Sequence, residues 1–255
     1  MLKQRMILCL LMNNDGVFFN SHGFKLQPIG EVDWIRRYLN FEAIDELVVL
    51  NIERENKNVG RFCENLLVLA KLCFVPICAG GGVSTIDDIR TLLDSGADKV
   101  SINSHTFDDP DFLRLASANY GAQCIVSSID VRRAGREHLV FDKCGTRRTG
   151  QKAAEWARRV EELGAGEIFL TSIDRDGRGT GYDLELVRSV VDAVSIPVIA
   201  SGGVGEFEHL VQGITVGGAS AVSAANIFHF IGNGLLNAKK HITGQGLNFP
   251  LWNFM

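Results

Sequence analysis

The sequence contains no C-x-x-C pair, although it has six cysteines: Cys9, Cys63, Cys73, Cys78, Cys124 and Cys144. Most of them lie in apolar stretches, which is typical of small buried thiols in a reducing compartment. The missing spacing argues against a disulfide framework and against a metal site. We therefore expect no metal and no cofactor, and a cytoplasmic protein.

Long apolar runs are also absent. None reaches the ~18 residues that a membrane-spanning helix needs. The N-terminal stretch MLKQRMILCLLMNND lacks a small-residue cleavage site and predicts a strand, not a signal peptide. The net charge is −4 and the sequence pI is about 5.9. This acidic balance argues against nucleic acid or an anionic membrane as a partner.

Eight short apolar runs alternate with segments of helical period. The runs are 5–11, 46–52, 75–80, 99–103, 124–130, 167–173, 196–201 and 220–225, and helices are expected within 57–72, 84–95, 151–164, 183–194 and 206–216. This alternation indicates a parallel sheet buried on both faces. Eight units predict an α/β fold, the (β/α)8 TIM barrel. The alternative, a doubly wound open sheet, would show fewer strands or a G-x-G-x-x-G turn after the first strand.

An internal repeat favours the barrel. AGGGVSTIDDIRTLLDSGADKVSINS (79–104) aligns with ASGGVGEFEHLVQGITVGGASAVSAAN (200–226), and ELVVLNI (46–52) matches EIFLTSI (167–173). A repeat of roughly 120 residues is too long for a solenoid unit. It predicts two half-barrels, about 1–120 and 121–230, in a single domain over 1–255 with a C-terminal extension, 231–255. The extension carries Phe249, Leu251, Trp252 and Phe254, which either cover a local core patch or dock a partner.

Glycines end one strand in each half, in AGGGV (79–83) and ASGGV (200–204). Glycine lets backbone N–H groups approach an anion, and the helix N-terminus that follows favours negative charge. Two copies in register predict two phosphate cradles and an elongated bis-phosphate ligand. Alternatively, these glycines only permit tight turns.

The loop LTSIDRDGRGTGYD (170–183) superficially fits a calcium loop. Arg178 occupies a ligand position and no helix precedes the loop, so we reject calcium. A polar, Gly-rich loop at this end of a barrel strand instead predicts that Asp176 and Gly177 present N–H groups to an anion.

Asp130 is expected at the end of the fifth strand, on the C-terminal rim of the barrel. A carboxylate there predicts a general acid or base, the alternative being a cap for the next loop. By the internal repeat, its counterpart in the first half is Leu11, which cannot exchange a proton.

Four charged residues open predicted strands at the opposite end of the barrel, its floor: Arg5, Glu46, Lys99 and Glu167. Taken alone, they predict a stabilising ring of ion pairs.

KVSIN, GAGEI, LTSIDRDG, GYD, IASGG and IFHF together resemble the HisF-type cyclase subunit of imidazole glycerol phosphate synthase, a histidine-biosynthesis barrel, over residues 1 to about 230. The resemblance implies a heterodimer with a glutaminase on the barrel floor and ammonia passing through the barrel. It also implies an ammonia gate at Arg5, Glu46, Lys99 and Glu167, and a glutaminase contact at Asp98.

The same resemblance assigns the catalytic face. It implies one phosphate cradle at Gly82, Asn103 and Ser104. It implies a second at Asp176, Gly177, Gly203, Ala225 and Asn226. Thr171 and Ser201 would line the site, and Asp130 would be one of two catalytic aspartates.

The departures from the family concentrate on the first half of that face. Leu11 replaces the other catalytic aspartate, Asn20 a lysine of the loop after strand one, and Asn51 an acid ending strand two. Asp15, four residues after Leu11, aligns with a different residue. Loss of a general acid or base costs a factor of about 10² to 10⁴ in rate.

These departures favour a divergent paralogue that pairs with a glutaminase and channels ammonia to an amidation or amidination, such as a sugar amidotransferase in bacterial surface sugar synthesis. One alternative is a working cyclase of histidine biosynthesis. Another is a non-catalytic activator of a glutaminase, and an isomerase sister family ranks lowest.

Overall fold

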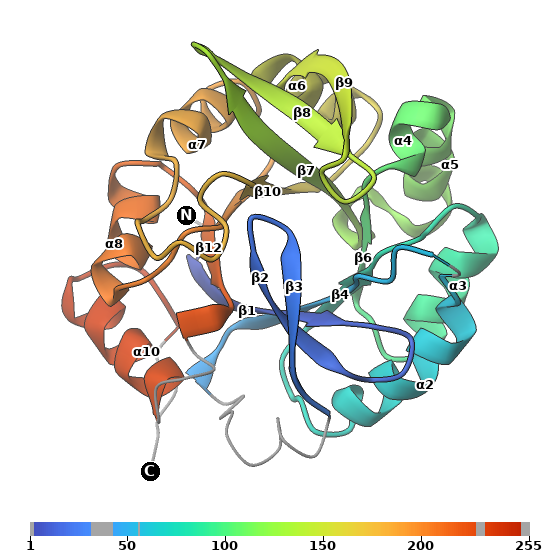
Figure 1. Cartoon of the computed structure of the whole chain (residues 1–255), viewed down its shortest axis with the longest axis horizontal. Helices are drawn as coiled ribbons and strands as arrows, with labels where there is room; N and C mark the ends of the chain where they lie inside the picture. Colours follow the sequence, from blue (N-terminus) through green and yellow to red (C-terminus); the bar gives the residue numbers. More distant parts are fainter. Residues whose placement is uncertain (1–2, 32–42, 56, 228–232, 251–255) are drawn as a thin grey trace.

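The computed structural model describes residues 3–31, 43–55, 57–227 and 233–250, and eight parallel strands among them close into a barrel (Figure 1). The barrel strands are β1 (Arg5–Met12), β4 (Glu46–Asn51), β5 (Ile77–Gly80), β6 (Lys99–Ile102), β7 (Ile125–Ala134), β10 (Glu167–Ser172), β11 (Val198–Ser201) and β12 (Ala221–Ala224). They pair in that order, and β12 pairs with β1 to close the ring. The prediction of a TIM barrel is confirmed.

Helices surround the barrel in Figure 1. Those described are α2 (Val59–Ala70), α3 (Ile86–Asp94), α4 (His105–Asp108), α5 (Pro110–Tyr120), α6 (Ala153–Glu162), α7 (Leu184–Val191), α8 (Phe207–Thr215) and α10 (Gly234–Gly244), with a 3₁₀ turn, η2, at Ala122–Cys124. The five helices expected from periodicity are all present. Each buries an apolar stripe on the barrel, as Ile89 and Leu92 of α3 do.

Two antiparallel hairpins at the C-terminal end of the barrel were not predicted. One consists of β2 (Phe18–His22) and β3 (Lys25–Gly30), and the other of β8 (Glu137–Asp142) and β9 (Arg147–Lys152). The expectation that Asp130 ends its strand is wrong, because pairing with β8 extends β7 to Ala134. Both hairpins are short and polar in part, so they gave no clear strand signal.

Side chains of β1 alternate between two apolar layers. Met6, Leu8 and Leu10 face the helices, whereas Ile7 and Cys9 belong to a separate cluster inside the barrel. Leu11 packs against that inner cluster. The period of two in a strand therefore directs Leu11 into the barrel mouth.

The C-terminal extension is tied to the floor of the barrel. Lys239 of α10 forms a buried ion pair with Asp45, with Nζ 2.6 Å from Oδ1 and 2.5 Å from Oδ2. The Phe249 ring lies 5.3 Å from the same Nζ and is buried. Phe249 thus covers a local patch, while Leu251, Trp252 and Phe254 lie outside the described residues. None of the described helices has the length and apolarity needed to cross a membrane.

Lys239→Met is expected to lower the free energy of unfolding by about 3–5 kcal/mol, because it leaves the Asp45 carboxylate buried without its cation. Lys152→Met is the matched control: Lys152 pairs with Glu137 on the surface, and both side chains are about half exposed. Loss of that pair should cost less than about 1 kcal/mol. Denaturant unfolding measures both, and equal effects would contradict the assignment.

Candidate active site and floor ring

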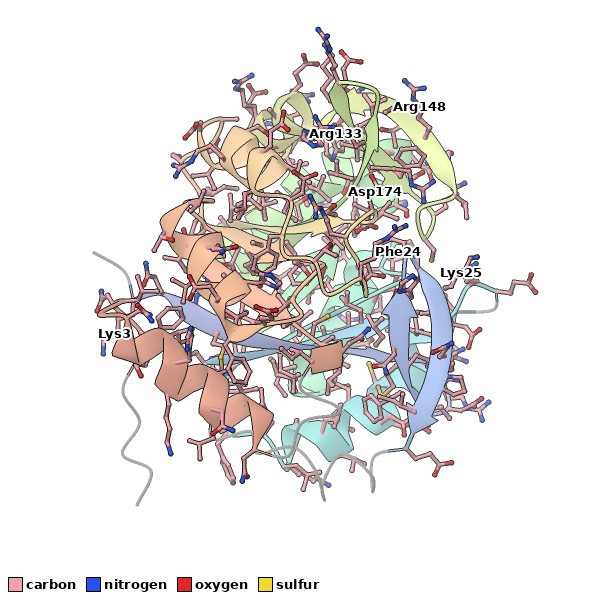
Figure 2. The ribbon with its side chains drawn as sticks, turned by 60° about the vertical axis from the view of Figure 1, so that its left-hand side comes forward. Lys3, Phe24, Lys25, Arg133, Arg148 and Asp174 are labelled. Atoms are coloured by element: carbon pink, nitrogen blue, oxygen red, sulfur yellow. The ribbon has the colours of Figure 1, made fainter. Side chains whose placement is uncertain are left out.

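The C-terminal ends of the barrel strands enclose a cavity of about 650 Å³. It is lined by residues from both halves of the barrel, and the β2–β3 hairpin lies across its mouth (Figure 1). Figure 2 shows Phe24 and Lys25 at the tip of this hairpin, at the opposite end of the molecule from Lys3. The C-terminal face is where TIM barrels carry their chemistry, so this cavity is the candidate active site.

Asp130 lies in the wall of the cavity and is buried, with 7% of its surface exposed. Burial raises the pKa of its carboxyl group to about 7, against the opposing hydrogen bond from Asn103 Nδ2, 2.7 Å from Oδ2. A carboxyl group with this pKa exchanges protons near neutral pH. Within the described residues, the hydrogen bond of its side chain is the one with Asn103, which does not support the alternative role of capping the next loop.

Leu11 also lines the cavity, on the strand diametrically opposite Asp130 in the eight-stranded ring. Its register partner on β4 is Leu50, and Ala225 packs on the same inner cluster. Leu11 is therefore surrounded by apolar side chains within the barrel. Asp15 does not compensate, because it forms an exposed ion pair with Arg61 at 2.5 Å and is absent from the cavity wall.

The two other positions that differ from the family pattern, Asn51 and Asn20, belong to segments around the mouth of the barrel. Asn51 is buried and lines the cavity, but its Nδ2 donates to Asn14 Oδ1 at 3.0 Å and its Oδ1 accepts from the Glu53 N–H at 3.0 Å. Asn20 is buried and lies outside the cavity wall. The hairpin thus directs no polar side chain from position 20 into the site.

Gly82, Asn103 and Ser104, the first predicted cradle, meet at one end of the cavity. Gly82 has φ +86°, and a Cβ there would lie 2.6 Å from Lys57 Cδ. The Asn103 side chain donates to Asp130, and Ser104 Oγ accepts from the Lys143 N–H at 2.9 Å. Asn103 Oδ1 is buried without a hydrogen-bond partner among the described residues, so it can accept from a ligand.

Gly177, Gly203, Ala225 and Asn226 of the second predicted cradle line the other end of the cavity. A Cβ at Gly203 would lie 2.2 Å from Gly181 O, and one at Gly177 would lie 2.2 Å from Ser21 O. Loop packing therefore requires these two glycines whether or not a ligand binds. Asn226 Nδ2 donates to Ser21 O at 2.9 Å and holds the hairpin. The phosphate role of both cradles stays a prediction.

The helices beyond the cradles satisfy their own N-termini. Asp88 Oδ2 accepts from the N–H groups of Ser84 and Thr85 at the start of α3, each at 2.9 Å. At the start of α8, the N–H groups of Gly205 and Glu206 both lie 3.2 Å from His209 Nδ1. These side chains satisfy N–H groups at the start of each helix.

Asp176 holds the hairpin closed. Its carboxylate accepts hydrogen bonds from the Ser21 hydroxyl and from the Phe24 N–H, the latter at 3.1 Å. Its own N–H donates to Ser172 O at 3.0 Å. The expectation that the Asp176 N–H faces an anion is therefore wrong, because the loop after β10 turns back on its strand. The sequence offered no signal for the contact between Ser21 and Asp176, which lie 155 positions apart in the chain.

Thr171 and Ser201 are register partners on β10 and β11, and both line the cavity, as predicted for their place in the site.

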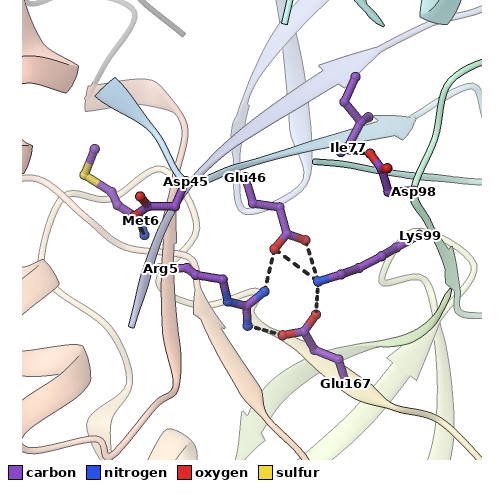
Figure 3. Close-up of polar contacts among 8 residues, drawn as sticks. All are labelled: Arg5, Met6, Asp45, Glu46, Ile77, Asp98, Lys99 and Glu167. Carbon is purple, nitrogen blue, oxygen red and sulfur yellow. Dashed lines mark hydrogen bonds and ion pairs between the residues drawn. The ribbon is translucent and has the colours of Figure 1, made fainter. Parts of the chain in front are cut away.

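At the floor, Arg5, Glu46, Lys99 and Glu167 form one closed network, drawn in Figure 3. Arg5 pairs with both acids, at 2.5 Å to Glu46. Lys99 Nζ lies 3.0 Å from Glu46 Oε1 and 2.8 Å from Glu167 Oε2. Although burial raises it, the pKa of Glu167 is held below its usual value by Arg5 and Lys99. The predicted ring of ion pairs is present.

The residues just before Glu46 and Lys99 tie the start of each strand to the backbone of its neighbour. Asp45 accepts from the Met6 N–H at 2.8 Å and donates its own N–H to Met6 O at 2.9 Å. Asp98 does the same with Ile77, both at 2.8 Å (Figure 3). Asp98 is exposed beside the ring, and its contact with a glutaminase stays a prediction.

Residues 9–232 match the family model described as "Histidine biosynthesis protein". The chain is also 43% identical, over 254 residues, to the imidazole glycerol phosphate synthase subunit HisF of Dehalococcoides mccartyi strain BAV1. This alignment covers 99% of the chain and 100% of the relative. The corresponding subunit of strain CBDB1 matches at the same identity and coverage.

Asp130→Asn should make stability less dependent on pH. Because the pKa of Asp130 is about 7 in the folded state and the usual pKa of an aspartate is 3.8, the wild type should lose stability as pH rises between these values. The loss is at most about 1.4 kcal/mol per pH unit. Denaturant unfolding at pH 5 and pH 8 should show a smaller difference for the variant. An equal difference in both proteins would mean that Asp130 ionises normally.

Proposed function

Because the chain belongs to the HisF family of imidazole glycerol phosphate synthase subunits, we propose that it is the ammonia-receiving barrel of a glutamine amidotransferase. A glutaminase docks on its floor, ammonia passes through the barrel, and the cavity at the mouth holds the molecule that accepts it. The observation that carries this proposal is the ion-pair ring, which lies at the floor below the apolar interior of the barrel.

The interior suits a small neutral molecule. Ile7, Val48, Phe169 and Ile199 form an apolar cluster along the barrel axis, and an ion would lose its hydration there at high cost. Ammonia in its neutral form does not carry that cost. All four charges of the ring are paired with one another, so the floor stays closed until its ion pairs rearrange.

At the mouth, only one of two opposite strand positions carries a proton donor or acceptor. Asp130 can act as general acid or base, whereas Leu11 on the opposite strand cannot. This supports an acceptor other than the bis-phosphate of the histidine-pathway cyclase, in an amidation or amidination such as that of a bacterial surface sugar. The identity to HisF subunits and the buried Asp130 support a second candidate, the complete cyclase.

Ammonium-supported turnover distinguishes the two candidates without a glutaminase. The purified chain is assayed at alkaline pH with the formimino-ribulosyl aminoimidazole bis-phosphate that the family resemblance implies. Under the main proposal the wild type shows no turnover, and Leu11→Asp gains a measurable rate because it restores a titratable group opposite Asp130. Leu11→Asn, similar in size and without a titratable group, is the control. Robust turnover by the wild type would establish the cyclase instead.

Docking at the floor is tested with the glutaminase subunit of an imidazole glycerol phosphate synthase, such as that of Dehalococcoides mccartyi. The wild-type chain should stimulate its hydrolysis of glutamine. Asp98→Asn should weaken the complex by up to about fivefold, because it removes the charge but keeps an acceptor for the Ile77 N–H. Asp87→Asn, an exposed residue of α3, should leave it unchanged. Absence of both binding and stimulation by the wild type would contradict the proposed pairing.

A further inference from the structure

Hydroxyl groups line one side of the base of the cavity, the end that faces the barrel interior. Five consecutive strands of the ring, from β6 through β7, β10 and β11 to β12, each contribute one of them: Ser101, Ser128, Thr171, Ser201 and Ser223. Ser201 is half-buried and the others are buried. The family resemblance assigns Thr171 and Ser201 to the site, but none of the other three. We call these five side chains the hydroxyl arc.

The hydroxyls of the arc have no hydrogen-bond partners among the described residues. Ser223 is the extreme case, because it is completely buried and its Oγ is unpaired. Its carbonyl oxygen accepts from the Tyr182 hydroxyl at 2.8 Å, so the strand is held while the side chain stays available. Buried polar groups are nearly always hydrogen-bonded, and an unpaired one costs stability. The arc therefore indicates partners from outside the chain.

The arc continues into Asp130. Asp130 and Thr171 are register partners on β7 and β10, and Thr171 pairs in turn with Ser201 on β11. Ser223 lies on the next strand, one residue beyond the last register pair of β11 with β12. Neighbouring strands are about 4.8 Å apart. A ring-shaped molecule with several hydroxyl groups can therefore contact two or three members of the arc and Asp130 together.

The strands opposite the arc offer little hydrogen bonding to a ligand. β1 and β4, which lie across the ring from β7 and β10, contribute Cys9, Leu11 and Leu50 to the wall. All three belong to the inner apolar cluster or pack against it. The amide of Asn51, at the end of β4, is already used in loop contacts. The base of the cavity is thus amphipathic, with hydroxyls facing aliphatic and thiol groups.

Few charges reach the base. Among the described wall residues that belong to barrel strands, the ionisable ones are Asp130 and Cys9. Burial raises the pKa of the Cys9 thiol to about 12, so it is neutral at physiological pH. The lysine, arginine and glutamate side chains of the wall come from the loops above. A charged ligand group at the base would lose its hydration without a counter-ion, at high cost.

A sugar ring combines the properties that the base requires. Its hydroxyls can donate and accept, as those of the arc do, and its C–H groups form an apolar face that suits Leu11 and Leu50. An aromatic ring would leave the arc unpaired. Cys9 and Phe169 both line the cavity and belong to the inner cluster. A ring at the base would therefore lie directly above the barrel interior.

We propose that the base of the cavity binds a neutral, polyhydroxylated ring of the acceptor, with its hydroxyl groups on the arc and its C–H face on Leu11 and Leu50. The inference rests on the proposed function in one respect, that the cavity holds the acceptor of ammonia. It names the chemical class of that acceptor, a sugar. Leu11 then contributes to binding, as part of the apolar wall on which the ring lies.

The test is a titration of the full chain with methyl β-glucopyranoside at pH 7.5, followed by NMR of the leucine methyl groups. Saturable binding at millimolar concentration is expected, with shifts at Leu11 and Leu50. Ser223→Ala should weaken binding about threefold to tenfold, because it removes one neutral hydrogen bond. Leu11→Asn should weaken it by a similar factor, because it places an amide in the apolar wall.

Ser189→Ala is the matched control, because Ser189 lies outside the cavity wall and its hydroxyl donates to Leu186 O at 2.8 Å. This variant should bind the glucoside as the wild type does. Cyclohexanol, a ring of the same size with one hydroxyl, should bind about tenfold more weakly.

Three outcomes would overturn the proposal: no saturable binding of the glucoside, equal affinities of wild type and Ser223→Ala, or equal affinities for the glucoside and cyclohexanol. Glutaminase stimulation depends on the floor and requires no member of the arc. Its presence or absence therefore tests the proposed function separately.

Discussion

The closed network of two cations and two acids at the floor constrains the rest of the structure. Arg5, Glu46, Lys99 and Glu167 each open a different barrel strand, and each acid contacts both cations. Removal of one member would leave a buried charge with too few ion-pair partners. The resulting loss of stability exceeds the net stability that the intact ion pairs provide. The strands must therefore keep the register that brings these four positions to one level.

Hydrogen bonds to the backbone connect this network to the surrounding elements. Asp45 and Asp98 join adjacent strands immediately beside Glu46 and Lys99, and Asp45 also receives the buried Lys239. The C-terminal helix thereby contacts the floor through a charge, not only through apolar packing. At the other end of the barrel the constraints are weaker, since the hairpin is held by loop contacts of Asp176, Asn226 and Arg54.

This difference between the two ends fits the pattern of substitution in the chain. The floor keeps every charged residue that the family resemblance implies. At the mouth, Leu11 continues the apolar inner face of β1, and Asn51 supports a loop. A strand residue that points into the mouth can change without disturbing the ring, because the two sites lie at opposite ends of the same strand. The chemistry of the mouth and the closure of the floor are physically separable.

The sequence by itself determined the barrel, its eight strands, five of its helices and the level of the four floor residues, because apolar periodicity and strand order are local properties. Only the tertiary structure decided the rest. The hairpins depend on antiparallel pairing, and the Asp176 contact joins distant loops. This contact brings together segments that are far apart in the chain, and no periodicity in the sequence records such proximity.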